Sequence, residues 1–371
     1  MHIYSPQHGR PSVDALTGIR FIAAFSVLLF HSGAGFASHH NAPRFIVNTL
    51  ENGYLGVSIF FMLSGFILTY NYYNRLELSR GGLLEFAVSR FARIYPVYIF
   101  FLIIILPLSM DKLYFSDACR VLLMVQSWTL PASDFGYSWI MQAWTLSIEL
   151  AFYIAFPLIL YFLSRIEMTK IAFPLVICFV LMVALATPTA SPGSVNRPFG
   201  SGNVPLPIIR MVEFVFGMLL CRAYFLRPQW LERVTGIATT LAVIVTVMLL
   251  ISTTKNIYAV SFAAALVGLL MYQLAAGNNF ITRGLGVRPM IILGGSSYAL
   301  YLSQGPVREW LRLLPSEALQ QAIYPFIAIG VSILVFLLWE QPLRRWIRRL
   351  GGYTGRKREI AQRTCIAVQT E

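Results

Sequence analysis

Apolar residues gather along the chain in long runs that short polar segments separate. A helix that crosses a bilayer needs about 20 mainly apolar residues. Runs of about that length occupy residues 16–36, 55–74, 93–110, 144–163, 170–187, 207–226, 235–252, 257–276, 289–308 and 321–340. The pattern therefore predicts an all-α, polytopic transmembrane helix bundle with about ten spans.

An eleventh apolar run, from Ala118 to Leu130, is shorter and is interrupted by Gln126 and Ser127. Polar side chains in a short apolar segment favour an interfacial or re-entrant element over a full span. We expect this segment to lie at the membrane surface or to enter the bilayer and return. The Gly- and Pro-rich residues 187–207 are expected to form an external loop.

Composition and charge agree with a membrane protein and suggest its topology. Hydrophobic residues make up 57% of the chain and charged residues only 12%. The net charge of +13 arises mainly in short loops and near the C-terminus, which indicates topology and not a nucleic-acid partner. Lysine and arginine are more than twice as frequent in the segments that become cytoplasmic if ten spans begin and end inside. We therefore expect both termini to be cytoplasmic.

Two further expectations concern the ends of the chain. The first apolar run is long, carries an internal arginine and is followed by more runs, so we expect it to remain as a helix. Residues 1–343 are predicted to form one integral-membrane domain, and residues 344–371 a basic cytoplasmic tail.

The first span holds a cation and an imidazole in apolar sequence. Arg20 and His31 are eleven residues apart, which places them on one face of a helix, about 16 Å apart along its axis. Polar and ionisable residues inside a membrane are costly and often functional. Given the expected topology, Arg20 lies near the cytoplasmic side and His31 nearer the outside. A histidine that is merely hydrogen-bonded within the bundle is the competing interpretation for His31.

Other ionisable residues fall at two expected depths. Arg90 and Arg93 lie near the level of Arg20, where guanidinium groups suit a phosphate-rich cytosolic ligand. Glu149 is expected near the depth of His31, where a carboxylate would orient the imidazole as a general base. Neither a hydrolase elbow motif nor a metal-ligand cluster occurs, and the four cysteines are scattered, so no metal site is predicted.

Several of these residues also have structural interpretations. Arg210 and Glu213 are three residues apart and have the spacing of an ion pair within one helix. Ser64 is a small residue that favours close helix packing over a nucleophilic role. Loop arginines such as Arg75 and Arg80 are typical of residues that set membrane orientation and contact anionic lipid.

Six motifs, taken in chain order, resemble those of the acyltransferase family 3 membrane proteins. They cover nearly the whole chain: Leu16-Thr-Gly-Ile-Arg20 with His31, Gly56 to Phe66, Arg90-Phe-Ala-Arg93-Ile-Tyr-Pro96, Trp144-Thr-Leu-Ser-Ile-Glu149 with Tyr153 and Pro157, Arg210-Met-Val-Glu213 with Gly217, and Ser297-Tyr-Ala-Leu-Tyr301-Leu. The resemblance implies transfer of an acyl group, usually acetyl, from cytosolic acyl-CoA to a hydroxyl of a carbohydrate or related acceptor.

The resemblance also implies roles for particular residues. His31 would be the catalytic base or acyl carrier, with Glu149 orienting it, and Arg20, Arg90 and Arg93 would bind acyl-CoA. Substrate-binding or supporting roles fall to Ser64, Trp144, Tyr153, Arg210, Glu213, Tyr298, Tyr301 and Gln304. The expected setting is the inner membrane of a bacterium, with membrane lipid, a carbohydrate or glycolipid acceptor, acyl-CoA and polysaccharide-assembly proteins as partners.

The chain departs from the family pattern at two places. Thr17 stands where many members carry aspartate, and Gln304 stands where a late histidine is common, which leaves His31 as the candidate base. The main prediction is an acyl-CoA-dependent O-acyltransferase of exopolysaccharide, O-antigen or lipo-oligosaccharide. The alternatives are an O-acyltransferase of a macrolide-type small molecule and a non-catalytic transporter or assembly subunit of polysaccharide export.

Overall fold

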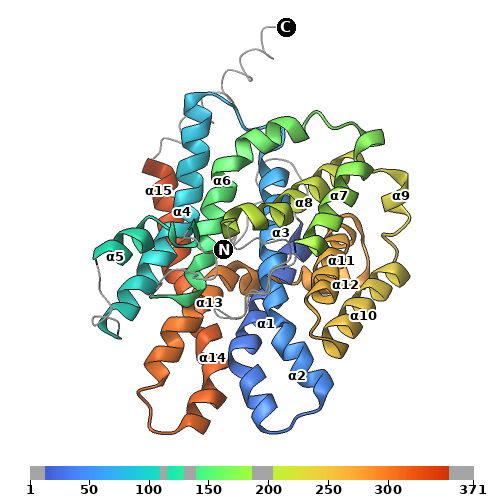
Figure 1. Cartoon of the computed structure of the whole chain (residues 1–371). Helices are drawn as coiled ribbons and strands as arrows, with labels where there is room; N and C mark the ends of the chain where they lie inside the picture. Colours follow the sequence, from blue (N-terminus) through green and yellow to red (C-terminus); the bar gives the residue numbers. More distant parts are fainter. Residues whose placement is uncertain (1–12, 109–114, 129–138, 186–203, 351–371) are drawn as a thin grey trace.

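The computed structural model describes residues 13–108, 115–128, 139–185 and 204–350, and this part of the chain contains helices and no strand (Figure 1). Each of the ten predicted ranges overlaps a helix in the described residues. These helices are α1 (Asp14–His39), α3 (Leu55–Tyr72), α4 (Arg80–Ile105), α6 (Trp144–Leu163), α7 (Ala172–Ala184), α8 (Leu206–Leu226), α10 (Ile237–Thr253), α11 (Ile257–Ala276), α13 (Arg288–Leu311) and α14 (Glu317–Val335). The all-α prediction is confirmed for the described residues.

Shorter helices connect or extend the long ones. The α-helices among them are α2 (Arg44–Glu51), α5 (Phe115–Leu122), α9 (Gln229–Glu232), α12 (Phe280–Leu285) and α15 (Gln341–Leu350). One-turn 3₁₀ segments are η1 (Asn52–Tyr54), η2 (Leu106–Leu108), η4 (Gln126–Trp128), η5 (Met141–Ala143) and η6 (Met168–Lys170). A π-helical turn, η8 (Phe336–Glu340), joins α14 to α15 without a break in the helical path.

Six helical segments of the described chain are long and apolar enough to cross a membrane: Asp14–His39, Arg44–Tyr72, Arg80–Leu108, Met141–Leu163, Ile257–Ala276 and Glu317–Arg349. Large apolar side chains on their outer surfaces are strongly exposed, among them Ile154 at 74% and Phe326 at 77%. Such a surface suits lipid, so the chain is a multi-pass membrane protein. The count of about ten spans and the cytoplasmic position of both termini stay predictions.

The segment predicted to be interfacial or re-entrant is broken into α5 and η4. Neither piece is long enough to cross a bilayer as one helix. Residues 129 and 130, at the end of that predicted segment, lie outside the described residues, as do most of the predicted external loop and the tail beyond Leu350.

Glycine contacts bring the central helices close together. A Cβ at Gly65 of α3 would lie 2.0 Å from the carbonyl oxygen of Phe214 in α8. A Cβ at Gly217 of α8 would lie 1.9 Å from the carbonyl oxygen of Met62 in α3. Only glycine permits such backbone contact, which is a common way for helices to associate in membranes. This close crossing holds α3 against α8.

Polar contacts link loops that the charge pattern assigns to the same side of the membrane. Arg222 of α8 donates hydrogen bonds to the Tyr73 hydroxyl and to the carbonyl oxygen of Ile166, at 2.8 Å for the latter. The Asn52 side-chain amide donates to the carbonyl oxygens of Ile251 and Thr254 at 2.8 and 2.7 Å. The first group joins loops predicted to be cytoplasmic, and the second joins loops predicted to be external.

Candidate active site

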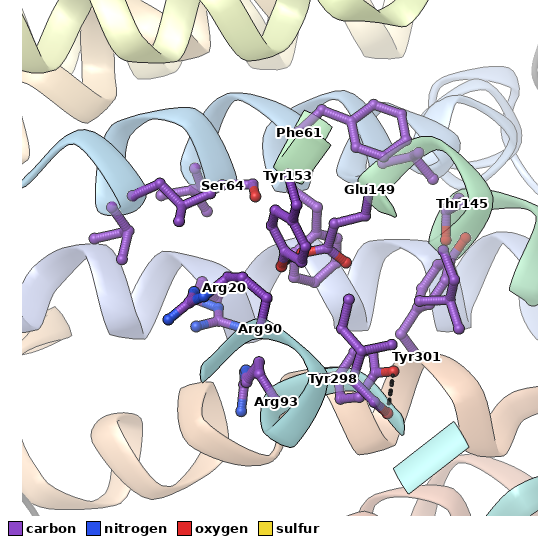
Figure 2. A pocket seen from close by; sticks show the side chains of 17 residues that line it. Arg20, Phe61, Ser64, Arg90, Arg93, Thr145, Glu149, Tyr153, Tyr298 and Tyr301 are labelled. Atoms are coloured by element: carbon purple, nitrogen blue, oxygen red, sulfur yellow. Dashed lines mark hydrogen bonds between the residues drawn. The ribbon is translucent and has the colours of Figure 1, made fainter. Parts of the chain in front are cut away.

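A cavity lies among α1, α3, α4, α6 and α13 (Figure 2). The cavity has a volume of about 110 Å³, and the whole space between its walls, which includes open solvent, is about 840 Å³. Eight residues singled out from the sequence line it: Arg20, Ser64, Arg90, Arg93, Glu149, Tyr153, Tyr298 and Tyr301. Residues far apart in the chain therefore meet at one place.

Three guanidinium groups gather at one side of the cavity, opposite Thr145 and Tyr301 (Figure 2). Arg20 comes from α1, and among the described residues no carboxylate forms an ion pair with it. Arg90 of α4 donates to the Tyr72 hydroxyl at 3.3 Å and lies over the aromatic ring of Tyr72, 5.4 Å from its centroid. Aromatic faces hold this cation without neutralising it.

Arg93 lies one turn along α4 from Arg90 and has a different environment. Its guanidinium forms an ion pair with Glu340, which is fully buried at the end of η8. It also lies over the ring of Tyr298, 5.5 Å from the ring centroid. The pair of contacts fixes the direction of the Arg93 side chain at the cavity wall.

Glu149 supplies the carboxylate of the cavity. It accepts a hydrogen bond from the Tyr153 hydroxyl one turn along α6. Its carboxylate also lies within electrostatic range of Arg90 and Arg93. Three cationic side chains therefore line the cavity beside one anionic side chain, which leaves a positive excess suited to an anionic ligand.

His31 lies outside this cavity, farther along α1. Its carbonyl oxygen accepts a hydrogen bond from Arg308 of α13, and its ring packs against Phe30 with centroids 4.9 Å apart. Arg308 follows Tyr301 by seven residues, which places its backbone about 10 Å farther along α13 than that cavity residue. Among the described residues, no hydrogen bond or ion pair joins His31 to Glu149. The contact expected from their depths is absent, because Glu149 lies level with the arginines.

Two buried amides occupy the region between the cavity and His31. Gln304 is 1% exposed, and neither its Nε2 nor its Oε1 has a hydrogen-bond partner among the described residues. The Oε1 atom of Gln142 in η5 is also buried and has no hydrogen-bond partner in the described part of the chain, and a Cβ at Gly305 would lie 3.0 Å from it. Buried polar atoms without partners are uncommon and mark a place for a polar ligand or water.

The remaining residues singled out from the sequence support the bundle. Arg210 and Glu213 form the ion pair that their spacing suggested, at 2.6 Å, and Ser58 of α3 donates to Glu213 at 2.8 Å. Trp144 is buried, and its carbonyl oxygen accepts from the Ser127 hydroxyl at 2.6 Å. None of the three predicted residues lines the cavity.

Sequence reasoning missed Thr145 and Glu340. Thr145 lines the cavity one turn before Glu149. The sequence pointed to Thr145 only weakly, because the residue lies in the same motif as Glu149. Glu340 gave a stronger signal, because a carboxylate at the end of an apolar run is costly unless it is paired. Within the described chain, no group of histidine, cysteine and carboxylate side chains is arranged to hold a metal ion.

Comparisons with known proteins match nearly the whole chain. The model of the acyltransferase domain of family 3 covers residues 13–353. Acyltransferase MdmB of Streptomyces mycarofaciens is 30% identical over 310 residues, which are 78% of this chain and 77% of MdmB. The O-acetyltransferase OatA of Staphylococcus aureus (strain NCTC 8325 / PS 47) is 24% identical over 82% of this chain and 51% of its own length.

The peptidoglycan O-acetyltransferase OatA of Listeria monocytogenes is 22% identical over 81% of this chain and 50% of its own length. The chain thus spans about half the length of the OatA proteins. No solved structure matches it. The family match covers the cavity, His31 and the helices that hold them, and the chain belongs to acyltransferase family 3, a family of acyltransferases.

Proposed function

We propose that this protein is an O-acyltransferase that moves an acyl group, in the first instance acetyl, from cytosolic acyl-CoA to a hydroxyl of an extracytoplasmic or lipid-linked carbohydrate. The observation that carries the proposal is the cavity in which Arg20, Arg90 and Arg93 gather on one side. His31 and the unpartnered amides lie beyond its other end. This is the arrangement expected of a donor site at the arginines that leads to an acceptor site near His31.

The donor fits the cationic side of the cavity. Coenzyme A carries phosphate groups on one end and a flexible pantetheine arm on the other. Guanidinium groups recognise phosphate oxygens through paired N–H donors. The apolar and tyrosine-lined remainder of the cavity, including Phe61 and Tyr301, suits the arm and the acyl thioester.

In the proposed reaction, the acceptor hydroxyl oxygen attacks the thioester carbonyl carbon, and His31 accepts the hydroxyl proton. The carbon–sulfur bond then breaks, the acyl group stays on the acceptor oxygen, and the departing sulfur takes up a proton as free coenzyme A. In the alternative sequence, His31 attacks first and carries the acyl group to the hydroxyl. Gln304 lies on α13 between the cavity residue Tyr301 and Arg308, which contacts His31, so it is placed to contact the reacting groups in either sequence.

We place the protein in the bacterial inner membrane with both termini in the cytoplasm, so that Arg20 faces the acyl-CoA pool and His31 faces the acceptor. Exopolysaccharide, O-antigen and lipo-oligosaccharide are the acceptor classes we propose. The peptidoglycan acceptor in the name of the Listeria relative, a polymer outside the membrane, supports an extracytoplasmic acceptor.

The test is acyl transfer by the intact chain in its membrane. Cells that carry the protein, His31→Gln or the control His39→Gln are compared for O-acetyl content of surface glycans and secreted small molecules by mass spectrometry. His39 lies on the same helix but is exposed, which makes it a matched control. We expect His31→Gln to lower O-acetylation by at least about a hundredfold at equal membrane abundance, while His39→Gln retains it.

The measurement also separates the proposed function from its rivals. Acetylated small molecules in place of acetylated glycan would indicate a macrolide-type acceptor. Full acetylation with His31→Gln would contradict catalysis by this histidine. An unchanged glycan with altered export in a strain lacking the protein would favour a transport or assembly role.

A further inference from the structure

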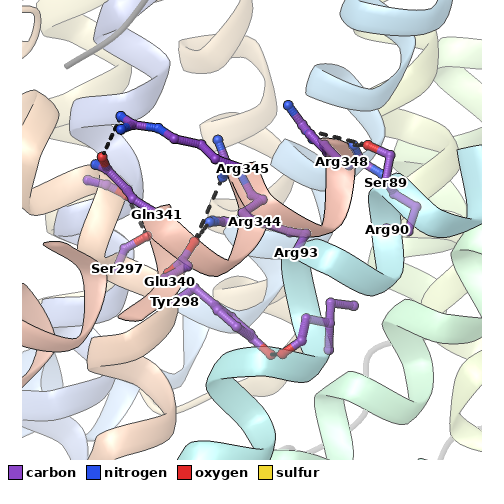
Figure 3. Close-up of polar contacts among 12 residues, drawn as sticks. Ser89, Arg90, Arg93, Ser297, Tyr298, Glu340, Gln341, Arg344, Arg345 and Arg348 are labelled. Carbon is purple, nitrogen blue, oxygen red and sulfur yellow. Dashed lines mark hydrogen bonds and ion pairs between the residues drawn. The ribbon is translucent and has the colours of Figure 1, made fainter. Parts of the chain in front are cut away.

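The C-terminal helix α15 places a row of arginines beside the cavity helix α4. It carries Arg344, Arg345, Arg348 and Arg349 within ten residues. Arg344 and Arg348 are partly buried on the side toward α4 (Figure 3). Arg345 and Arg349 are exposed. The spacing of four residues explains the division, because residues four apart share one face of a helix.

Two polar residues link the inward pair to the cavity arginines (Figure 3). The Oε1 atom of Glu340 contacts Arg93 and also lies 3.8 Å from Arg344. The Ser89 hydroxyl accepts from Arg90 at 3.1 Å and from Arg348 at 3.4 Å. Each cavity arginine of α4 therefore shares a partner with one arginine of α15.

The linked group brings several positive charges together. Four guanidinium groups come together from α4 and α15, and the carboxylate of Glu340 contacts two of them, Arg93 and Arg344. The Arg93 guanidinium also lies within electrostatic range of Arg20 and Arg344. Like charges held at this density repel unless an anion binds among them. Four guanidinium groups gathered at one end of a cavity suit a ligand with several negative charges.

We propose that α15 forms the nucleotide end of the donor site, where Arg344 and Arg348 bind the phosphate groups of acyl-CoA. The inference deepens the proposed function and rests on it. The phosphates of coenzyme A follow directly on the pantetheine arm, so an arm in the cavity brings them to the cationic end of the cavity. Arginine suits this task because its planar group donates two parallel hydrogen bonds to a phosphate.

The same chemistry would attract phosphate groups of anionic lipids, so the test must separate the two sources. The chain is purified in nanodiscs, and binding of coenzyme A is measured by calorimetry. The double variant R344Q/R348Q is compared with R345Q/R349Q, which removes the same charge from the exposed side of the same helix. Arg348→Gln alone is included in case the double variant does not fold.

We expect R344Q/R348Q to weaken coenzyme A binding roughly ten- to a hundredfold, and R345Q/R349Q to weaken it less than about threefold. Adenosine 3′,5′-diphosphate should displace coenzyme A from the wild-type chain. It should not displace coenzyme A from R344Q/R348Q. Equal coenzyme A affinity in the wild-type and R344Q/R348Q chains would overturn the inference while leaving the proposed function in place. A wild-type chain that does not bind coenzyme A would overturn both.

The lipid source is tested in the same nanodiscs. If coenzyme A is the ligand, the loss in R344Q/R348Q is the same in phosphatidylcholine nanodiscs with and without phosphatidylglycerol. A loss that appears only with phosphatidylglycerol, and equally in R345Q/R349Q, would identify a general lipid surface and overturn the inference.

Discussion

Arg308 donates a hydrogen bond from its guanidinium group to the main-chain carbonyl of His31. The contact ties α13 to α1 at the level of the imidazole. Arg308 is itself held over the ring of Tyr324 in α14, 5.5 Å from the ring centroid. Three helices thus fix the position of His31, although Glu149 takes no part in doing so.

Arg308→Gln is therefore expected to lower the rate of acyl transfer while the membrane abundance of the protein changes little. The shorter side chain loses the charged hydrogen bond, and a misplaced catalytic group costs rate more than donor affinity. We expect kcat to fall about tenfold or more and the KM for acetyl-CoA to change less than about threefold. Arg312→Gln is the control, because Arg312 is exposed and pairs only with Glu309 in the described structure. A raised KM with unchanged kcat would instead assign Arg308 to donor binding.

Gln304 offers a test in which stability and activity should change in opposite directions. Its amide atoms are buried and have no hydrogen-bond partner among the residues that the structure describes, and such atoms cost free energy of folding. Gln304→Leu should therefore raise the free energy of unfolding by about 1–2 kcal/mol, which is measured as a higher midpoint of thermal unfolding in detergent. The same variant should lower acyl transfer at least about tenfold, since it removes a hydrogen-bonding group between the cavity and His31. Full activity in a stabilised Gln304→Leu chain would show that the amide serves no ligand.

The buried pair of Arg210 and Glu213 is expected to be structural. Removal of one partner leaves a buried charge, so Glu213→Leu should destabilise the chain by about 3–5 kcal/mol. Replacement of both, as Arg210→Met with Glu213→Leu, should restore the stability and the acyl transfer, because an apolar pair can replace a buried ion pair. The stability is measured by thermal unfolding of the single and double variants, and the acyl transfer by their O-acetylation of the acceptor. A stable but inactive double variant would return these residues to the substrate-supporting role that the sequence motifs suggested.

The helices were predictable because each apolar run is long and has polar ends. The ten predicted ranges differ from the helices mostly at their boundaries; α4, for example, begins at Arg80, whereas the apolar run begins at residue 93. The first half of α4 was not predicted because it is not a continuous apolar run. Its polar side faces outward, with Arg80 and Glu85 exposed. Periodicity within the apolar runs also placed Arg20 and His31 on one face, since a single helix fixes both.

Relations between helices were less predictable. Membrane depth alone placed Glu149 level with His31, but its carboxylate lies at the cavity, within electrostatic range of Arg93. Depth estimated from an apolar run is uncertain by a turn or more, because tilt and the exact start of the helix are unknown. Glu340 lies far from Arg93 in sequence, and single-sequence reasoning has no signal for pairing between distant helices.

The glycine contact between α3 and α8 leads to the most direct test of the fold. Gly65→Ala would put a Cβ 2.0 Å from the Phe214 carbonyl oxygen, so the two helices must move apart. We expect a loss of about 1–3 kcal/mol in the free energy of unfolding, with lower acyl transfer because α3 also carries Ser64 and Phe61 at the cavity wall. Gly330→Ala in α14 is the control, since a Cβ there has no atom within 4 Å, and alanine should stabilise that helix by about 0.5–1 kcal/mol. Equal unfolding midpoints for the two variants would contradict the close crossing of α3 and α8.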